Sequence, residues 1–182
     1  MKKTILLFAL TLSVAAGFAQ SKKTTTSATV AFDATTPADA LPKAETKTAV
    51  ASLDTKKGTV KFEALLTSFT FPNAKIQEHF NAPNWMDSEK FPKASFSGKI
   101  TNLSAVNFKK DGTYTANVEG DLTLHGKTNK VSTTATIVVT GKAVAASSNF
   151  SVKLADYGVD GPAVGAGKVS KEPKIAVKAD FK

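Results

Sequence analysis

Few side chains in this sequence could bind a metal ion or exchange protons near neutral pH. The chain has two histidines, His79 and His125, and it has no cysteine. A zinc site needs three or four convergent ligands, so two histidines alone are not enough. A metal site formed by the two histidines together with carboxylates is the alternative, but no spacing in the sequence indicates such a site. We therefore expect no metal and no cofactor.

Motifs for nucleophilic or phosphate chemistry are also missing from the sequence. No serine lies in a Gly-x-Ser-x-Gly elbow, and no Gly-x-Gly-x-x-Gly or Walker-type loop occurs. Asp87 and Glu89 flank a predicted loop, where exposure to water explains a pair of carboxylates. The glycines between Gly161 and Gly167 belong to a loose loop without a following helix. We expect that the protein is not an enzyme.

His125 lies where two strand-like patterns meet, in the stretch DLTLHGKTNKV at residues 121–131. The alternation before it places Leu122 and Leu124 on an inner face and His125 on the outer one. Gly126 can adopt a positive φ, and a polar turn is predicted over residues 127–129. A histidine at a strand end can hydrogen-bond across such a turn. We therefore interpret His125 as part of a hairpin and not as a catalytic group.

The dominant pattern in the chain is an alternation of apolar and polar residues, which is typical of strands with one buried face. Short connections separate most runs, so neighbouring strands should pair as antiparallel hairpins. Long antiparallel strands tend to close on themselves, so we predict an all-β, up-and-down barrel of about eight strands. A two-sheet sandwich is the alternative. Residues 21–26 are polar and are predicted to be a frayed start. The predicted strands are Val30–Phe32, Glu45–Leu53, Val60–Leu66, Phe96–Ile100, Tyr114–Leu124, Val131–Val139, Phe150–Leu154 and Ile175–Phe181.

One segment, residues 73–90, departs from the strand pattern. Ile76 and Phe80 are one helical turn apart, and Pro83 ends the pattern. We predict one short helix near residues 74–80, lying across an opening of the barrel, with Trp85 and Met86 in the loop behind it. Residues 157–173 are predicted to be a long loop before the last strand.

The first residues are typical of a secretory signal peptide. A basic start precedes an apolar run, and small residues precede a cleavage position after Ala19. The run is shorter than the ~20 residues that a membrane-spanning helix needs. We predict a signal peptide at residues 1–19 and a single domain at residues 20–182. The mature protein is expected in the periplasm or outside the cell, without stable insertion in a membrane.

The basic residues are all lysines, and the formal net charge is +9. Nucleic-acid sites favour arginine, whose planar group matches phosphates and guanine edges. The lysines are also scattered along the chain, so we expect no nucleic-acid partner. We interpret them mainly as a solubilising coat; attraction to anionic lipid surfaces or acidic ligands is the alternative.

Three blocks of the sequence resemble the YceI-like family. DLTLHGKTNKV is similar to a Leu-Thr-(Leu/Ile)-His-Gly-x-Thr-(Lys/Asn)-x-Val hairpin of that family. The segment from Glu78 to Phe96 is similar to a second block, and Ala155–Gly158 is similar to an Asp-(Phe/Tyr)-Gly turn. The resemblance implies an exported, lipocalin-like barrel without established catalytic activity. It implies a polyisoprenoid or another long-chain lipid as the partner.

An eight-stranded barrel has room for packed side chains or for one small ligand. Its predicted inner face is rich in phenylalanine, which suits an alkyl or isoprenoid chain. Small inward residues at Ala64, Gly98, Ala116, Gly120 and Ala135 indicate empty volume. A filled barrel that serves as a structural or interaction protein is the alternative, and a homodimer is left open. The predicted ligand-binding residues are Phe62, Leu66, Phe69, Ile76, Phe80, Trp85, Phe96, Ile100, Val118, Leu122, Ile137, Phe150 and Val152.

Overall fold

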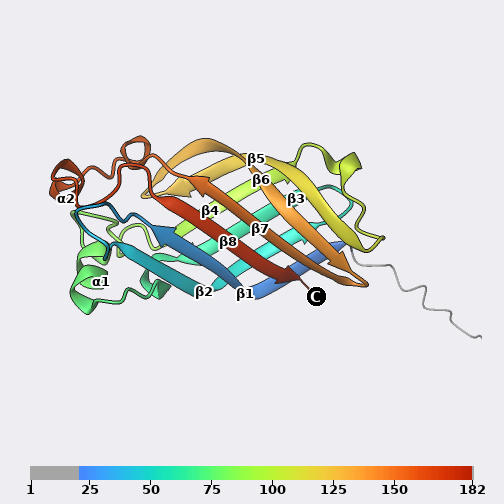
Figure 1. The fold of residues 1–182 in the computed structure, drawn as a ribbon, viewed down its shortest axis with the longest axis horizontal. Helices are drawn as coiled ribbons and strands as arrows, with labels where there is room; N and C mark the ends of the chain where they lie inside the picture. The colour runs from blue at the N-terminus through green and yellow to red at the C-terminus, as the bar shows by residue number, and fades with distance from the viewer. Residues whose placement is uncertain (1–20, 182) are drawn as a thin grey trace, which may run out of the picture.

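Eight antiparallel strands close into one barrel in the computed structural model, which describes residues 21–181. The strands pair in chain order and β8 pairs back with β1 (Figure 1). This order confirms the predicted up-and-down barrel, because a sandwich would leave two separate sheets. The predicted signal peptide lies outside the described residues. The strands are β1 (Lys22–Asp33), β2 (Lys43–Asp54), β3 (Thr59–Leu65), β4 (Lys93–Ile100), β5 (Gly112–Leu124), β6 (Lys127–Thr140), β7 (Ala143–Ser151) and β8 (Lys174–Phe181).

Two strands begin earlier than the sequence pattern predicts. The polar first part of β1 pairs with β2 from Lys22↔Asp54 to Thr25↔Ala51, so the prediction of a frayed start is wrong. β7 begins at Ala143 and ends at Ser151, so Val152 lies in the following connection. Polar residues show no apolar alternation, but their backbone groups can pair across strands all the same.

The two ends of the barrel are built differently (Figure 1). At one end, where β1 begins and β8 ends, the strands are joined by residues 55–58, 101–111 and 141–142. At the other end, long connections carry α1 (Ala74–Asn81) after β3 and α2 (Pro162–Gly165) after β7. We call these the turn end and the helix end. The connections also contain the 3-10 segments η1 (Leu66–Ser68), η2 (Leu103–Ala105) and η3 (Leu154–Tyr157).

Helix α1 forms where the sequence predicts it. The side chain of Asn73 caps the helix by accepting hydrogen bonds from the backbone N–H groups of Lys75 (2.9 Å) and Ile76 (3.4 Å). The ring of Phe80 packs against the rings of three other phenylalanines, with centroid distances of 6.1 Å to Phe32, 6.1 Å to Phe69 and 5.0 Å to Phe71. These contacts hold α1 against the helix end of the barrel.

The segment predicted to be a long loop, residues 157–173, contains the one-turn helix α2. Pro162 lies in its first turn, where a missing N–H removes no helical hydrogen bond. A Cβ atom on the neighbouring Gly161 would lie 3.0 Å from the indole ring of Trp85. The two long connections therefore meet at the helix end. Within residues 21–181, no helix combines the length and the apolar character that crossing a bilayer requires.

Candidate ligand-binding cavity

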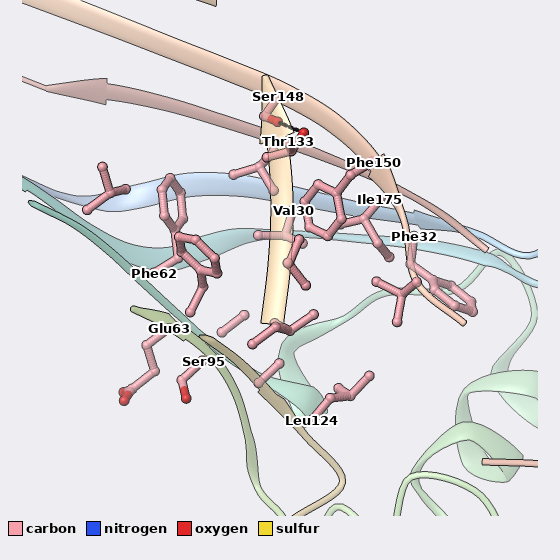
Figure 2. A pocket seen from close by; sticks show the side chains of 18 of the residues that line it. Val30, Phe32, Phe62, Glu63, Ser95, Leu124, Thr133, Ser148, Phe150 and Ile175 are labelled. Carbon is pink, nitrogen blue, oxygen red and sulfur yellow. Dashed lines mark hydrogen bonds between the residues drawn. The ribbon is translucent and has the colours of Figure 1, made fainter. Parts of the chain in front are cut away.

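The inward side chains of all eight strands surround a cavity of about 180 Å³. Figure 2 shows Phe62, Val30 and Phe150 extending into it from β3, β1 and β7. Among the described lining residues, only Glu63, Ser95, Thr133, Ser147 and Ser148 are polar. The wall of the cavity is therefore almost entirely hydrocarbon.

The structure brings nearly all of the predicted ligand-binding residues to this cavity. The exception is Ile76, which is not among the residues that line the cavity. Ile76 is half-buried against the core, and Phe80 follows it by one helical turn, about 6 Å along the axis. Only the last turn of α1 thus reaches the cavity. The predicted residues that line it are Phe62, Leu66, Phe69, Phe80, Trp85, Phe96, Ile100, Val118, Leu122, Ile137, Phe150 and Val152.

The cavity also contacts residues that the sequence prediction left out. Most of them follow the same alternation of apolar and polar residues as the predicted ones, so the sequence pattern of each strand also indicates that they point inward. Met86 is different, because it lies in the loop after α1 and only the packing of that loop brings it inward. The apolar residues that were left out include Val30, Phe32, Leu53, Val60, Met86, Leu124, Val131, Ile175, Val177 and Phe181.

The empty space is not distributed evenly along the barrel axis. Near the turn end the inward side chains are tightly packed: Leu53 is 2% exposed, Ile137 2% and Phe181 1%. Farther from the turn end, Phe62 in β3 and Phe150 near the end of β7 also point inward but are only half-buried. A half-buried side chain inside a closed barrel faces empty volume. The turn end is therefore the floor of the cavity, and its space lies in the middle and toward the helix end.

A cover of two connections lies over the helix end of the cavity. Phe80 and Met86 from the β3–β4 connection are buried and line the cavity from this side. Ser88 Oγ donates a hydrogen bond of 2.7 Å to Asn81 Oδ1, which ties the loop after α1 back to the helix. Trp85 contacts Gly161 in the β7–β8 connection. The prediction that the helix lies at an opening, with Trp85 and Met86 beside it, agrees with this arrangement.

Two inward glycines make room for a side chain and not for a ligand. Gly98 and Gly120 face each other across β4 and β5. A Cβ atom on Gly98 would lie 2.6 Å from Phe96 Cζ, and one on Gly120 would lie 2.7 Å from the same atom. The Phe96 ring therefore lies over the glycine pair. The expectation of empty volume at these two positions is wrong, whereas Ala64 and Ala135 do line the cavity.

Three of the five polar residues in the wall, Glu63, Thr133 and Ser148, form side-chain hydrogen bonds. Thr133 Oγ1 and Ser148 Oγ are 3.1 Å apart (Figure 2). Ser148 Oγ donates a hydrogen bond to the carbonyl oxygen of Thr134 at 2.8 Å. Glu63 points away from Phe62 in Figure 2, and its carboxylate accepts a hydrogen bond of 2.9 Å from Lys93. No lysine is among the described lining residues. The cavity can therefore hold an apolar chain.

His125 is part of the β5–β6 hairpin. Leu124 pairs with Lys127, so the turn consists of His125 and Gly126, with φ values of 50° and 73°. Two positive φ values are typical of a type I′ turn. The prediction that residues 127–129 belong to the turn is wrong, because β6 already begins at Lys127.

The His125 side chain joins three segments at the helix end. Its Nδ1 lies 3.2 Å from the carbonyl oxygen of Tyr157 and must donate, since a carbonyl only accepts. Its ring meets Phe91 edge-on, with centroids 4.8 Å apart. His79 lies on α1 instead, and residues 21–181 contain no cluster of three or more His, Cys, Asp or Glu residues suited to a metal. These contacts support the structural interpretation of His125.

Comparison with known sequences identifies relatives of this chain. A model of the YceI-like domain matches residues 11–181. A UPF0312 protein of Pseudomonas fluorescens is 38% identical over 77 residues, which are 42% of this chain and 38% of that protein. A UPF0312 protein of Pseudomonas putida is 33% identical over 96 residues, which are 50% of this chain and 46% of that protein. The chain thus spans about half or less of the length of these curated relatives.

Solved structures share the fold at low sequence identity. A polyisoprenoid binding domain from Saccharophagus degradans superposes with a TM-score of 0.74 at 10% identity, covering 90% of this chain and 98% of that domain. BcnA from Burkholderia cenocepacia gives a TM-score of 0.69 at 18% identity, covering 85% of this chain and 96% of that protein. At these identities the similarity shows the fold alone.

Proposed function

Because this chain belongs to the YceI-like family, we propose that its barrel binds the hydrocarbon chain of a long-chain amphiphile, a polyisoprenoid or a similar lipid. The observation that carries the proposal is the cavity, whose wall is almost entirely hydrocarbon. Apolar surface that leaves water gains about 25 cal/mol per Å². The domain from Saccharophagus degradans that shares this fold is described as polyisoprenoid-binding, which is consistent with such a ligand.

The size of the cavity limits how a long chain would bind. A volume of about 180 Å³ lies below the ~300–1,000 Å³ of most ligand pockets. Only part of a long chain fits inside while the cover is in place. The rest requires that the cover moves, since the floor at the turn end is tightly packed. The polar head group would remain outside the apolar wall.

The neighbouring residues Phe62 and Lys61 allow a matched test of this proposal. Phe62 lines the cavity, whereas Lys61 is exposed on the outer face of the same strand. Phe62→Ala is expected to weaken binding of geranylgeraniol about ten- to a hundredfold, because a buried phenylalanine contributes ~1.5–3 kcal/mol. Lys61→Ala should bind as the parent does. The titration follows the fluorescence of Trp85, which lines the cavity and is the single tryptophan of the chain.

A filled barrel that serves as a structural or interaction protein is the competing function. Native mass spectrometry of the protein purified from its own cells separates the two. An adduct of lipid mass supports the carrier. A bare chain, together with a Phe62→Ala variant that is folded and binds geranylgeraniol as tightly as the parent, would rule it out. Urea unfolding of each variant separates lost affinity from lost stability.

We also propose that the protein is exported. The proposal rests on the basic start, the apolar run and the small residues before position 20. The expected mature form begins at Gln20 and is recovered from the periplasm or the medium. A protein that keeps Met1 and its first residues in the cytoplasm, as mass spectrometry would show, contradicts this proposal.

A further inference from the structure

The excess positive charge of the protein is concentrated at the turn end of the barrel. Each end of the barrel comprises its connections and the two nearest residues of every strand. The turn end then holds eight lysines and three carboxylates, an excess of five positive charges. The helix end holds nine lysines and eight carboxylates, an excess of one. The lysines of the turn end are Lys22, Lys23, Lys56, Lys57, Lys99, Lys109, Lys110 and Lys142.

Two of the three carboxylates at the turn end, Asp54 and Asp111, accept hydrogen bonds from the backbone of the turns. Asp54 Oδ1 accepts hydrogen bonds from the backbone N–H groups of Lys56 (2.9 Å) and Lys57 (3.0 Å). Asp111 Oδ1 accepts one from the backbone N–H of Gly141 at 2.8 Å. The salt bridges found within residues 21–181 involve Lys47, Lys93 and Lys130, none of which is at this end.

Five of the eight turn-end lysines lie on three separate connections between strands. Lys56 and Lys57 follow β2, Lys109 and Lys110 precede β5, and Lys142 lies between β6 and β7; all five are exposed. These three connections lie at the same end of the barrel (Figure 1), so the exposed lysines are distributed over that end. Lysine is a flexible point charge, whereas recognition of one shaped anion favours the planar fork of arginine. The chain has no arginine. Such a distribution of lysines complements an extended layer of negative charge.

We propose that the turn end docks on the surface of an anionic lipid bilayer. Each lysine near such a surface increases partitioning about fivefold, and the attraction falls off within a Debye length. Strands of 12 to 14 residues, such as β1 and β6, make the barrel about 30 Å long when tilted as in closed barrels. The helix end, with its cover and Trp85, then faces away from the membrane. This docking does not depend on what the cavity binds.

Co-sedimentation with vesicles tests the docking. The probes are vesicles of phosphatidylcholine alone and vesicles of phosphatidylcholine with phosphatidylglycerol. The protein is expected to bind the second kind at low ionic strength and to be released by high salt. Lys56→Glu/Lys57→Glu should bind at least tenfold more weakly, since it turns two attractions into two repulsions. Lys168→Glu/Lys171→Glu makes the same change in net charge at the helix end and should bind within about twofold of the parent.

The single tryptophan reports the orientation on the membrane. With brominated phospholipids in the vesicles, Trp85 at the helix end should keep its fluorescence, because bromine quenches only at short range. Quenching of Trp85, equal losses in the two double variants, or no binding to phosphatidylglycerol vesicles would each overturn the proposal. Geranylgeraniol titrations of both folded variants should match the parent. A failure of the docking is thereby separated from a failure of the lipid-binding function.

Discussion

Ala135→Phe is expected to weaken geranylgeraniol binding at least a hundredfold while the barrel stays folded. Ala135 lies on β6, is half-buried and lines the cavity. The cavity has a volume of about 180 Å³, and a phenyl ring added to its wall at this position would project into that space. Each methylene that the ring displaces forfeits ~0.8 kcal/mol, so about four of them correspond to a hundredfold in affinity.

The control for this variant is the next residue on the same strand. Thr136 is exposed on the outer face of β6, so Thr136→Phe adds the same ring outside the barrel. It should bind geranylgeraniol as the parent does. Trp85 fluorescence measures the affinity, and circular dichroism with thermal unfolding checks the fold. We expect the melting temperature of Ala135→Phe to stay close to that of the parent, since the ring fills existing space. A folded Ala135→Phe protein with the affinity of the parent would place the ligand elsewhere.

Gly120→Ala is expected to lower the free energy of unfolding by about 3 kcal/mol or more, the upper part of the range for overpacked cores. A Cβ atom at this position would lie 2.5 Å from Gly98 Cα, 2.5 Å from the carbonyl oxygen of Ser97 and 2.7 Å from Phe96 Cζ. Two of these three contacts are with backbone, which cannot rotate away. The new methyl group must therefore push β4 and β5 apart. For a domain of this size the loss corresponds to a decrease of about 6–12 °C in melting temperature.

Gly165→Ala is the matched control for this prediction. Gly165 lies in α2, and a Cβ atom there would have no heavy atom within 4 Å among the described contacts. The same substitution should be neutral or stabilising by up to about 1 kcal/mol, because alanine has less freedom to lose on folding. Urea unfolding measures both variants. Equal unfolding midpoints for the parent and Gly120→Ala would show that the two strands adjust without strain.

The strand pattern and the short helix could be predicted from the sequence because both signals are local. An alternation of apolar and polar residues follows from the period of two in an extended strand. Ile76 and Phe80 show the helical period in the same way. The polar first half of β1 could not be predicted from this alternation. Its threonines pair through their backbone groups and form no apolar face.

The residues of the cavity wall were predicted from the same alternation, but the cavity itself was not. In a sequence, a glycine at an inward strand position predicts unfilled volume, because it has no side chain. At Gly98 and Gly120 that space is filled by Phe96, which lies two residues from one glycine and on the strand next to the other. Conversely, Met86 reaches the cavity from a loop, where no periodic pattern indicates its direction.

The sequence by itself determined the barrel, the inward set of side chains and the total charge of the protein. Only the tertiary structure decided where the barrel is hollow, how its helix end is covered, and that the excess lysines gather at the turn end. Whether a side chain points inward depends on the backbone geometry of its own strand, because successive side chains alternate between the two faces. Empty volume and charge density depend instead on residues from several strands that meet in space. Their meeting is decided by the closure and register of the whole barrel.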